Sequence, residues 1–395
     1  MPPKTTASAP PLLSLTEARR RILGAQGLFD GPCFGEGRTG TLAAIEHLGY
    51  VQIDTISVVE RAHHHVLWSR IPDYTPSRLN DLQGDRAVFE YWSHAAAILP
   101  MRDFRFALPR MEAFAKGKRH WFRRDKKVHR YVLDRIRGEG PLRARDFEAP
   151  AGHRGGSWFE WKPAKSALEQ LFWCGELMVR ERRRFEKVFD LRERVLPASV
   201  DARMPSEEEF LRHLVVTALR AQGLAAAREI SYQRHVSAAK LTKVLREMRE
   251  AGEILEFGVE GLPSETFYGL KAAGQIPGGD AGSAVHILSP FDNLVIQRKR
   301  LSRLFGFDYQ VECYVPGPKR KFGYFCLPIL RGTDFLGRLD AKADRAAAVL
   351  RVENFHWEPA VRARSLHLDA IKTAVEKFAL FNACPKTQGF NKITK

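Results

Sequence analysis

The residues best suited to chemistry are an amide and a carboxylate two positions apart, Gln52 and Asp54, in the segment GYVQIDTISV. In an extended segment, positions two apart project from the same face. Asp54 could accept a proton from a water molecule, and Gln52 could orient that water by donating and accepting hydrogen bonds. The alternative is that Asp54 caps the next turn and Gln52 is half exposed. Residue chemistry alone favours this alternative, because polar pairs are common on strand faces that meet water.

Three consecutive histidines, His63 to His65, follow in RAHHHVL. Adjacent positions on a helix point about 100° apart, so the three rings cannot converge on one ion. In a strand only His63 and His65 would share a face, and no carboxylate or cysteine completes a set at metal-ligand spacing. We therefore predict no metal site, and we expect the histidines to be solvated, packed or facing a nucleic acid.

Other familiar catalytic motifs are missing from the sequence, which has no P-loop, G-x-S-x-G or H-E-x-x-H and no G-x-G-x-x-G that opens a helix after a strand. Nucleotide-driven chemistry is therefore disfavoured, and no cofactor is predicted. The 63 Lys and Arg residues against 46 Asp and Glu give a net charge of +17. Such a charge favours a polyanionic partner, because Lys and Arg displace counterions from phosphates. Two classes stay open: a DNA-binding protein without chemistry, or a DNA-acting enzyme that needs only a positioned water.

The five cysteines are odd in number and form no C-x-x-C pair, so a zinc site or disulfide framework is not expected. A reduced, cytoplasmic compartment fits better. The first residues have no apolar stretch of signal-peptide or membrane length. We expect a disordered arm over 1–12, a frayed tail at CPKTQGFNKITK, and no membrane partner.

The elements that must position these residues begin with a capping box, Ser14-x-x-Glu17, which predicts the start of the first helix. A second helix should run into an extended segment at Tyr50–Ile56, because β-branched and polar residues alternate there. The following stretch, Pro72–Lys127, is predicted to be mostly helical. These elements make up an N-terminal helical or winged-helix region, 13–127.

Two later regions share the order helix, turn, helix, hairpin, which is typical of a winged helix. In the second region Ser237 should begin the third helix and Gly252 should follow its end. A Gly-rich stretch, 274–283, leads into strand-like segments and a closing helix. The predicted fold class is thus α+β, and the further regions are a winged helix at 128–200, a winged helix at 201–275, a β-rich barrel or sheet at 283–359, and a helix at 360–385.

A basic tip, GPKRK, lies between the strand-like segments DYQVECYVP and KFGYFCLPIL. Lys319, Arg320 and Lys321 would therefore lie at the end of a β-hairpin. Such a hairpin can place its charges along phosphates and an aromatic residue or backbone against a groove. A basic turn that simply faces solvent is an equally weighted alternative.

Several long strings together resemble the AlkZ/YcaQ family of bacterial winged-helix DNA glycosylases. They include GYVQIDTISVVERAHHHVLWSR, FEYWSHAAAILP, WKPAKSALEQLFWCGELMV, LSPFDNLVIQRKRLSRLFGF and GRLDAKADR. The resemblance spans about residues 12–380. It implies tandem winged helices in a C-shaped arrangement, with a β-rich C-terminal part. It also implies excision of alkylated bases, including N7-alkylguanines that crosslink the two strands of DNA.

The family motif is Q-x-Q or Q-x-D, and Gln52-Ile53-Asp54 is similar to the second form, that of the YcaQ-like branch. The resemblance implies a general repair glycosylase without metal or cofactor, in which Asp54 assists the attack of water and Gln52 positions it. Lys319 to Lys321 match a family hairpin that engages the minor groove, and we expect His65 and Arg70 to contact DNA as well. The expected partner is double-stranded DNA with alkylated or crosslinked guanine, bound by a cytoplasmic, nucleoid-associated monomer. The alternative is a non-enzymatic winged-helix DNA-binding protein or transcription regulator.

Overall fold

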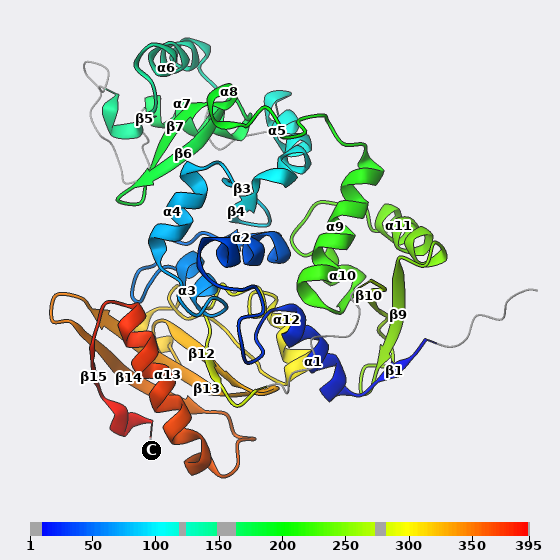
Figure 1. Cartoon of the computed structure of the whole chain (residues 1–395), viewed down its shortest axis with the longest axis vertical. Coiled ribbons are helices and arrows are strands. Elements are labelled where there is room, and N and C mark those ends of the chain that lie inside the picture. Colours follow the sequence, from blue (N-terminus) through cyan, green and yellow to red (C-terminus); the bar gives the residue numbers. More distant parts are fainter. Residues whose placement is uncertain (1–9, 118–123, 148–162, 273–281, 394–395) are drawn as a thin grey trace, which may run out of the picture. The chain divides into compact units, whose positions relative to one another are not determined.

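The chain folds into two compact units, and one of them is inserted in the sequence of the other. The inserted unit is Pro76–Phe210, and the split unit combines Met1–Thr75 with Leu211–Lys395 (Figure 1). This computed structural model describes residues 10–117, 124–147, 163–272 and 282–393. Most of the predicted disordered arm and most of the predicted Gly-rich linker lie outside the described residues. Among the described residues, no helix is long and apolar enough to cross a membrane.

The inserted unit contains the first winged helix. Asp125 caps its first helix by accepting the N–H groups of Lys127 and Val128. Arg184 and Phe185 form a left-handed turn between the two long strands, with φ of 49° and 70°. The sheet has the order first, third, second strand. In chain order the elements are α6 (Lys126–Glu139), β5 (Leu142–Arg143), the 3₁₀ turn η2 (Ala144–Asp146), α7 (Pro163–Trp173), β6 (Leu177–Arg183), β7 (Glu186–Leu191) and α8 (Arg192–Val195).

The second winged helix has the same strand order. Ser237 accepts the N–H of Lys240 at the start of the third helix, and Gly252 follows its end with a left-handed φ of 68°. The tandem winged-helix prediction and the α+β fold class are therefore confirmed. A short strand, β1 (Leu12–Leu13), adds in parallel beside β9. The elements are α9 (Glu207–Gln222), β8 (Ala225–Ala226), α10 (Ala227–Ile230), α11 (Ala238–Glu250), β9 (Ile254–Val259) and β10 (Phe267–Leu270).

The stretch predicted as mostly helical, Pro72–Lys127, contains a β-hairpin that the prediction missed. Its strands β3 (Val88–Trp92) and β4 (Ala96–Pro100) pair antiparallel. Glu90 in β3 is held by Arg182 at 2.7 and 2.8 Å, and its apolar neighbours are buried. Aromatic and β-branched residues favour strands where they pack against a core, which outweighs the helical character of the flanks. The flanking helices are α4 (Pro76–Gly84), the 3₁₀ helix η1 (Met101–Ala107) and α5 (Leu108–Ala115).

The C-terminal part of the split unit is a five-stranded sheet that curls into a half-barrel, with α13 (Leu368–Phe381) packed against it (Figure 1). All its strand pairs are antiparallel except the last, β14 with β15. The predicted fold class included a β-rich C-terminal part, and this prediction is confirmed. The strands are β11 (Val285–Ile287), β12 (Cys326–Arg331), β13 (Asp334–Asp344), β14 (Val349–Trp357) and β15 (Lys386–Gln388).

The end of the chain is more ordered than predicted. The closing helix begins at Leu368 rather than near 360, because Ala363 has a left-handed φ of 46° and a 3₁₀ turn η4 (Arg364–His367) precedes the helix. The tail is not frayed within the described residues. It adds β15 to the sheet, continues into the 3₁₀ turn η5 (Phe390–Lys392), and buries Ile393 in the core.

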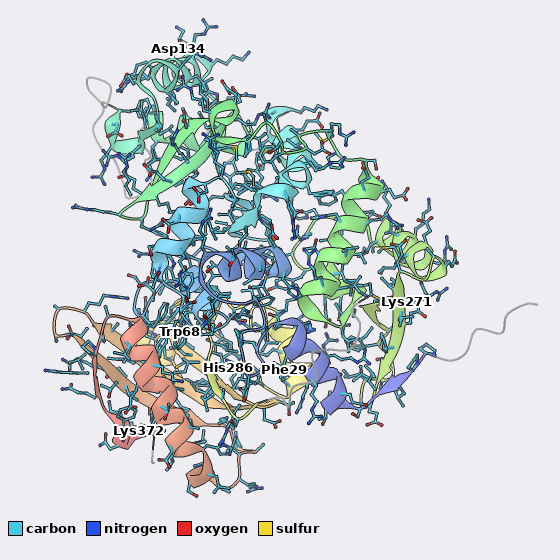
Figure 2. The ribbon with its side chains drawn as sticks, in the orientation of Figure 1. Phe29, Trp68, Asp134, Lys271, His286 and Lys372 are labelled. Carbon is cyan, nitrogen blue, oxygen red and sulfur yellow. The ribbon has the colours of Figure 1, made fainter. Side chains whose placement is uncertain are left out.

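The split unit also contains four further helices and the short strand that includes Gln52. The Ser14–Glu17 capping box is present, with the Ser14 N–H donating to Glu17 at 2.8 Å. Trp68, which is labelled in Figure 2, lies at the end of α3. Its ring stacks on that of Phe381 on α13, with ring centres 4.9 Å apart. This stacking ties the segment after Gln52 and Asp54 to the C-terminal sheet. The elements are α1 (Leu15–Ala25), α2 (Gly37–Leu48), α3 (Ala62–Trp68), α12 (Arg298–Phe305) and the strand β2 (Val51–Gln52).

Candidate active site

The segment that carries Gln52 and Asp54 starts where α2 ends. The helix stops at Gly49, whose φ of 75° is left-handed. A Cβ on this residue would lie 2.2 Å from Thr217 Cγ2 on α9. Both the backbone conformation and the close approach of α9 therefore require glycine. The chain then enters β2, where Val51 is fully buried.

The predicted extended segment, Tyr50–Ile56, is a strand only at Val51–Gln52. Asp54 Oδ1 accepts the backbone N–H of Ile56 at 2.8 Å, which turns the chain. The strand prediction was wrong beyond Gln52, because this side chain offers the backbone a local hydrogen bond in place of strand pairing. Asp54 thus caps a turn, as the alternative expected. A carboxylate has about four acceptor positions, so one such bond leaves capacity for a water molecule.

Gln52 and Asp54 differ in exposure. Gln52 is only 7% exposed, so its amide is held in the interior rather than half exposed. Asp54 is half-buried. Burial raises the pKa of the Asp54 carboxyl above its ordinary value, and the N–H groups of Ile56 and Thr55 partly oppose this rise. A carboxylate in this setting can accept a proton and can stabilise a cation that develops nearby.

Three hydrogen bonds from distant segments hold the backbone on both sides of this pair. Asn293 Nδ2 donates to the carbonyl oxygen of Tyr50 at 3.1 Å. On the other side, the N–H of Ala343 donates to the carbonyl of Val58 at 2.9 Å, and the N–H of Glu60 donates to Asn382 Oδ1 at 2.6 Å. The Q-x-D segment is thus fixed against the loop before α12, against β13 and against the end of α13.

Asn293 also has an acceptor that the protein does not use. The residue is 7% exposed, and its Oδ1 is buried without a hydrogen-bond partner among the described residues. A buried acceptor without a partner costs about 1–3 kcal/mol. Such an atom next to the Q-x-D backbone is suited to accept a hydrogen bond from a ligand or a water molecule.

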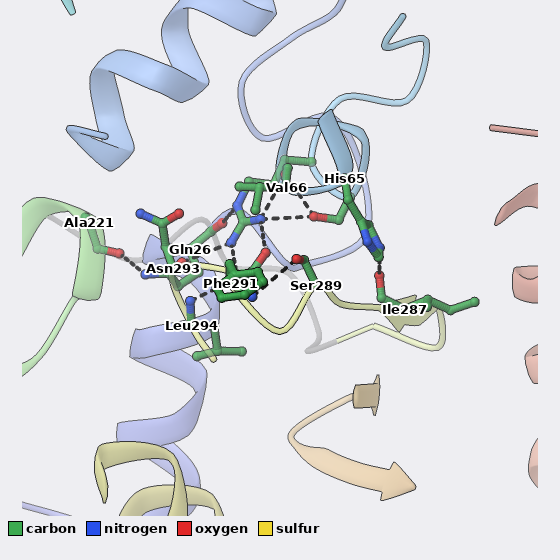
Figure 3. A network of polar contacts seen from close by, with 12 residues as sticks. Gln26, His65, Val66, Ala221, Ile287, Ser289, Phe291, Asn293 and Leu294 are labelled. Atoms are coloured by element: carbon green, nitrogen blue, oxygen red, sulfur yellow. Dashed lines mark hydrogen bonds and ion pairs between the residues drawn. The ribbon is translucent and has the colours of Figure 1, made fainter. Parts of the chain in front are cut away.

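Arg70 lies in the interior of the split unit, where it forms an ion pair with Asp292. Both side chains are 0% exposed, and the two guanidinium nitrogens reach the two carboxylate oxygens at 2.7 and 2.9 Å. Further bonds go to Gln26, Val66 and Ser69. Figure 3 shows Gln26 and Val66 as members of this network. A guanidinium that is saturated in this way has no face left for a phosphate. In this arrangement Arg70 supports the loop that carries Asn293, rather than meeting DNA directly as we expected from the sequence.

The three histidines are packed on α3. His65 is 0% exposed, its Nε2 bonds the carbonyl of Ile287 at 2.8 Å, and its ring lies 4.8 Å from that of Phe378. Burial lowers the pKa of His65 to about 4, so the ring is neutral at pH 7 and offers no charge to a phosphate. His64 Nδ1 bonds the Tyr74 hydroxyl at 2.7 Å. We expected the histidines to be solvated, packed or facing a nucleic acid, and the structure shows that they are packed.

The basic residues Lys319 to Lys321 lie on a braced loop and not at a β-hairpin tip. DYQVECYVP is not a strand, and a 3₁₀ turn η3 (Gly317–Lys319) follows it. The hairpin prediction was wrong here because the buried carboxylate of Glu312 folds the chain back by accepting the N–H groups of Lys321, Phe322 and Gly323. Lys319 and Lys321 remain exposed.

This loop is near Asp54. After burial, the negative charge of Asp54 is the largest cause that raises the pKa of the Cys313 thiol and of the Tyr314 hydroxyl. The split unit therefore brings the Q-x-D segment together with the start of the loop, across more than 250 positions of sequence. Sequence reasoning missed Asn293, Glu312 and Tyr314. Asn293 could have been suspected from its place in SPFDNLV, whereas nothing local indicates the role of Glu312.

Two winged helices in tandem, a strongly basic chain and a half-buried carboxylate beside a basic loop define a winged-helix protein of the kind that acts on DNA. A family model described as "DNA glycosylase AlkZ-like" matches residues 45–381. The chain therefore belongs to the AlkZ-like DNA glycosylase family. Membership makes it a DNA repair enzyme, and the non-enzymatic alternative loses its support.

A solved structure supports the fold. The chain is similar to the Streptomyces sahachiroi DNA glycosylase AlkZ, with a TM-score of 0.64 and 16% sequence identity. The likeness covers 95% of this chain and 99% of the other. At this identity the likeness concerns the fold alone.

Proposed function

We propose that the enzyme hydrolyses the N-glycosidic bond of N7-alkylguanine in double-stranded DNA, including guanines that crosslink the two strands. The observation that carries this proposal is the half-buried Asp54 carboxylate, whose pKa is raised by burial and whose segment is fixed on both sides. The similarity of Gln52-Ile53-Asp54 to the Q-x-D motif gives further support. In the proposed reaction the C1′–N9 bond breaks, and a bond forms between C1′ and a water oxygen.

The chemistry follows from the charge of the lesion. Alkylation at N7 gives guanine a positive charge, so the base departs as a neutral molecule without being protonated. The sugar then resembles an oxocarbenium ion, which a nearby anion stabilises more strongly than it stabilises the ground state. Asp54 supplies that anion and accepts the proton of the attacking water, while the buried Gln52 amide orients the water. In this proposal no metal, cofactor or lyase lysine takes part, and the product is an abasic site.

The exposed Lys319 and Lys321, with Arg320 between them, are proposed to contact phosphates next to the lesion. A crosslinked base is tethered to the opposite strand, so we propose an open site that faces a groove rather than a closed pocket for a flipped base. We further propose that the enzyme acts as a monomer on cytoplasmic, nucleoid DNA.

The test is base release from two duplexes, one with a single N7-methylguanine and one with a defined interstrand crosslink between guanines. Alkaline cleavage reports abasic sites, and separation of the strands on a denaturing gel reports unhooking. Asp54→Asn should lower the rate by about 10²–10⁴-fold, because a positioned base contributes that much. Gln52→Ala should also lower it, and the exposed Asp308→Asn should not. EDTA should leave the wild-type rate unchanged.

Affinity for undamaged duplex should not fall in Asp54→Asn, since this change removes a negative charge and no positive one. The proposal fails if wild-type protein releases neither base. It also fails in its assignment of Asp54 if Asp54→Asn keeps a rate within about tenfold of wild type, which is below the contribution expected of a general base.

A further inference from the structure

The loop near Asp54 exposes two aromatic rings. Tyr314 is 76% exposed and is the most exposed large hydrophobic side chain among the described residues. Tyr324, at the other end of the loop, is 39% exposed. Between them, the Arg320 guanidinium lies 4.8 Å from the centre of the Tyr324 ring. An aromatic face that the protein leaves uncovered is available to stack on a flat ligand.

The loop is held rigidly although its tip faces solvent. Glu312 is 6% exposed and accepts three backbone N–H groups of the loop at 2.7–3.1 Å. Asp340, on β13, accepts the N–H of Tyr324 at 3.2 Å. Gly323 has a φ of 141°, and a Cβ there would lie 1.9 Å from Asp340 Oδ2. A connecting turn does not need two inward-facing carboxylates, so this bracing indicates that the position of the tip matters.

The start of the loop shares its support with the Q-x-D segment. Ile56, two residues after Asp54, and Cys313, immediately before Tyr314, pack against the same apolar cluster under the C-terminal sheet. The electrostatic effect of Asp54 on the Tyr314 hydroxyl agrees with this proximity. Tyr314 thus projects an exposed ring close to the carboxylate that we propose to act on the sugar.

We propose that Tyr314 determines specificity for charged lesions by stacking its ring on the cationic alkylated purine. This inference rests on the proposed function and adds a recognition residue to it. A cation held over an aromatic face is attracted by the electron density of the ring, whereas neutral guanine gains only stacking. The ring of Tyr314 and the carboxylate of Asp54 together form an environment that favours positive charge on the base.

The experiment compares two duplexes that have nearly the same shape and differ in charge. One carries 2′-fluoro-N7-methylguanine, which is cationic and resists hydrolysis, and the other carries neutral 7-methyl-7-deazaguanine. Tyr314→Leu removes stacking from both duplexes, and it should weaken binding of the cationic duplex by about fivefold more than it weakens binding of the neutral duplex. Tyr314→Phe keeps the ring and should keep the wild-type preference. Tyr131→Leu, at a tyrosine that is 47% exposed on α6, is the matched control and should change neither affinity.

Equal losses on both duplexes, or no loss on either, would overturn the role of Tyr314 in recognising charge. Circular dichroism should show that Tyr314→Leu is folded, because the ring it removes is exposed. Base release by wild type separates the two proposals. If wild type releases N7-methylguanine and Tyr314→Leu keeps its preference for the cationic duplex, only this inference fails. If wild type releases no base, the proposed function fails first.

Discussion

Replacing Arg70 with Met distinguishes an internal role from a role in DNA binding. The substitution removes a guanidinium that bonds both oxygens of Asp292 in a fully buried pair. Within the part of the chain that the structure describes, the Asp292 carboxylate would then keep only backbone bonds, such as the one from the N–H of Leu294 at 2.9 Å. Leaving one member of a buried pair uncompensated destabilises a protein by about 3–5 kcal/mol. That is a large part of a typical free energy of unfolding of about 5–15 kcal/mol.

The assay is urea unfolding of the full chain, combined with hydrogen exchange to localise the change to α3 and residues 289–297. Both regions should exchange faster in Arg70→Met. The double variant Arg70→Met with Asp292→Leu replaces both charges by apolar groups and should be more stable than Arg70→Met alone. With the single variant Asp292→Leu, the four proteins form a double-mutant cycle, and its coupling free energy should be about 2 kcal/mol or more for a buried pair.

DNA binding by the folded fraction tests the alternative, in which Arg70 contacts DNA. If Arg70 contacted a phosphate, Arg70→Met would remove that contact. The slope of log affinity against log salt would then become smaller by about one. We expect that slope to be unchanged. Destabilisation below about 1 kcal/mol together with a reduced slope would refute the reasoning, because a surface position typically shows such small effects. Arg70 would then meet DNA as the sequence predicted.

Four further predictions concern the site itself. Because burial raises the pKa of Asp54 above 3.8, the acidic limb of the pH profile of kcat/KM should lie above that value. Since the folded pKa is the higher one, the stability that protonated Asp54 contributes is lost as pH rises through it, so Asp54→Asn should be at least as stable as wild type in urea at pH 7. The double variant Lys319→Ala with Lys321→Ala should reduce the salt slope of duplex binding by about two, with stability unchanged. Asn293→Leu removes the bond to the carbonyl of Tyr50 and should slow base release about tenfold or more, with duplex affinity kept; an unchanged rate would show that this bond does not align the segment.

The order of helices and strands could largely be predicted from the sequence, because its signals are local. Ser14 with Glu17, Ser237 and Gly252 fix helix ends through hydrogen bonds and backbone conformations that involve only their neighbours. Both winged helices follow from such signals combined with amphipathic periodicity. The family also follows from the sequence, since its motif and flanking strings are contiguous.

Elements stabilised by distant residues were harder to predict. The β3–β4 hairpin was missed because its strands depend on packing and on the Arg182–Glu90 pair, whose members are 92 positions apart. The C-terminal tail was missed because β15 gains its hydrogen bonds from β14. The basic loop was misassigned because Glu312 accepts its backbone donors from nine to eleven positions further along the chain.

By itself, the sequence determined the Q-x-D tripeptide, the tandem winged helices and the basic character of the chain. Only the tertiary structure decided which charged residues are free to meet DNA. Arg70 and Lys319 look alike as sequence, yet Arg70 is neutralised by an aspartate 222 positions away, while Lys319 remains exposed. Burial depends on what the rest of the chain brings to a residue, and no local pattern contains that information.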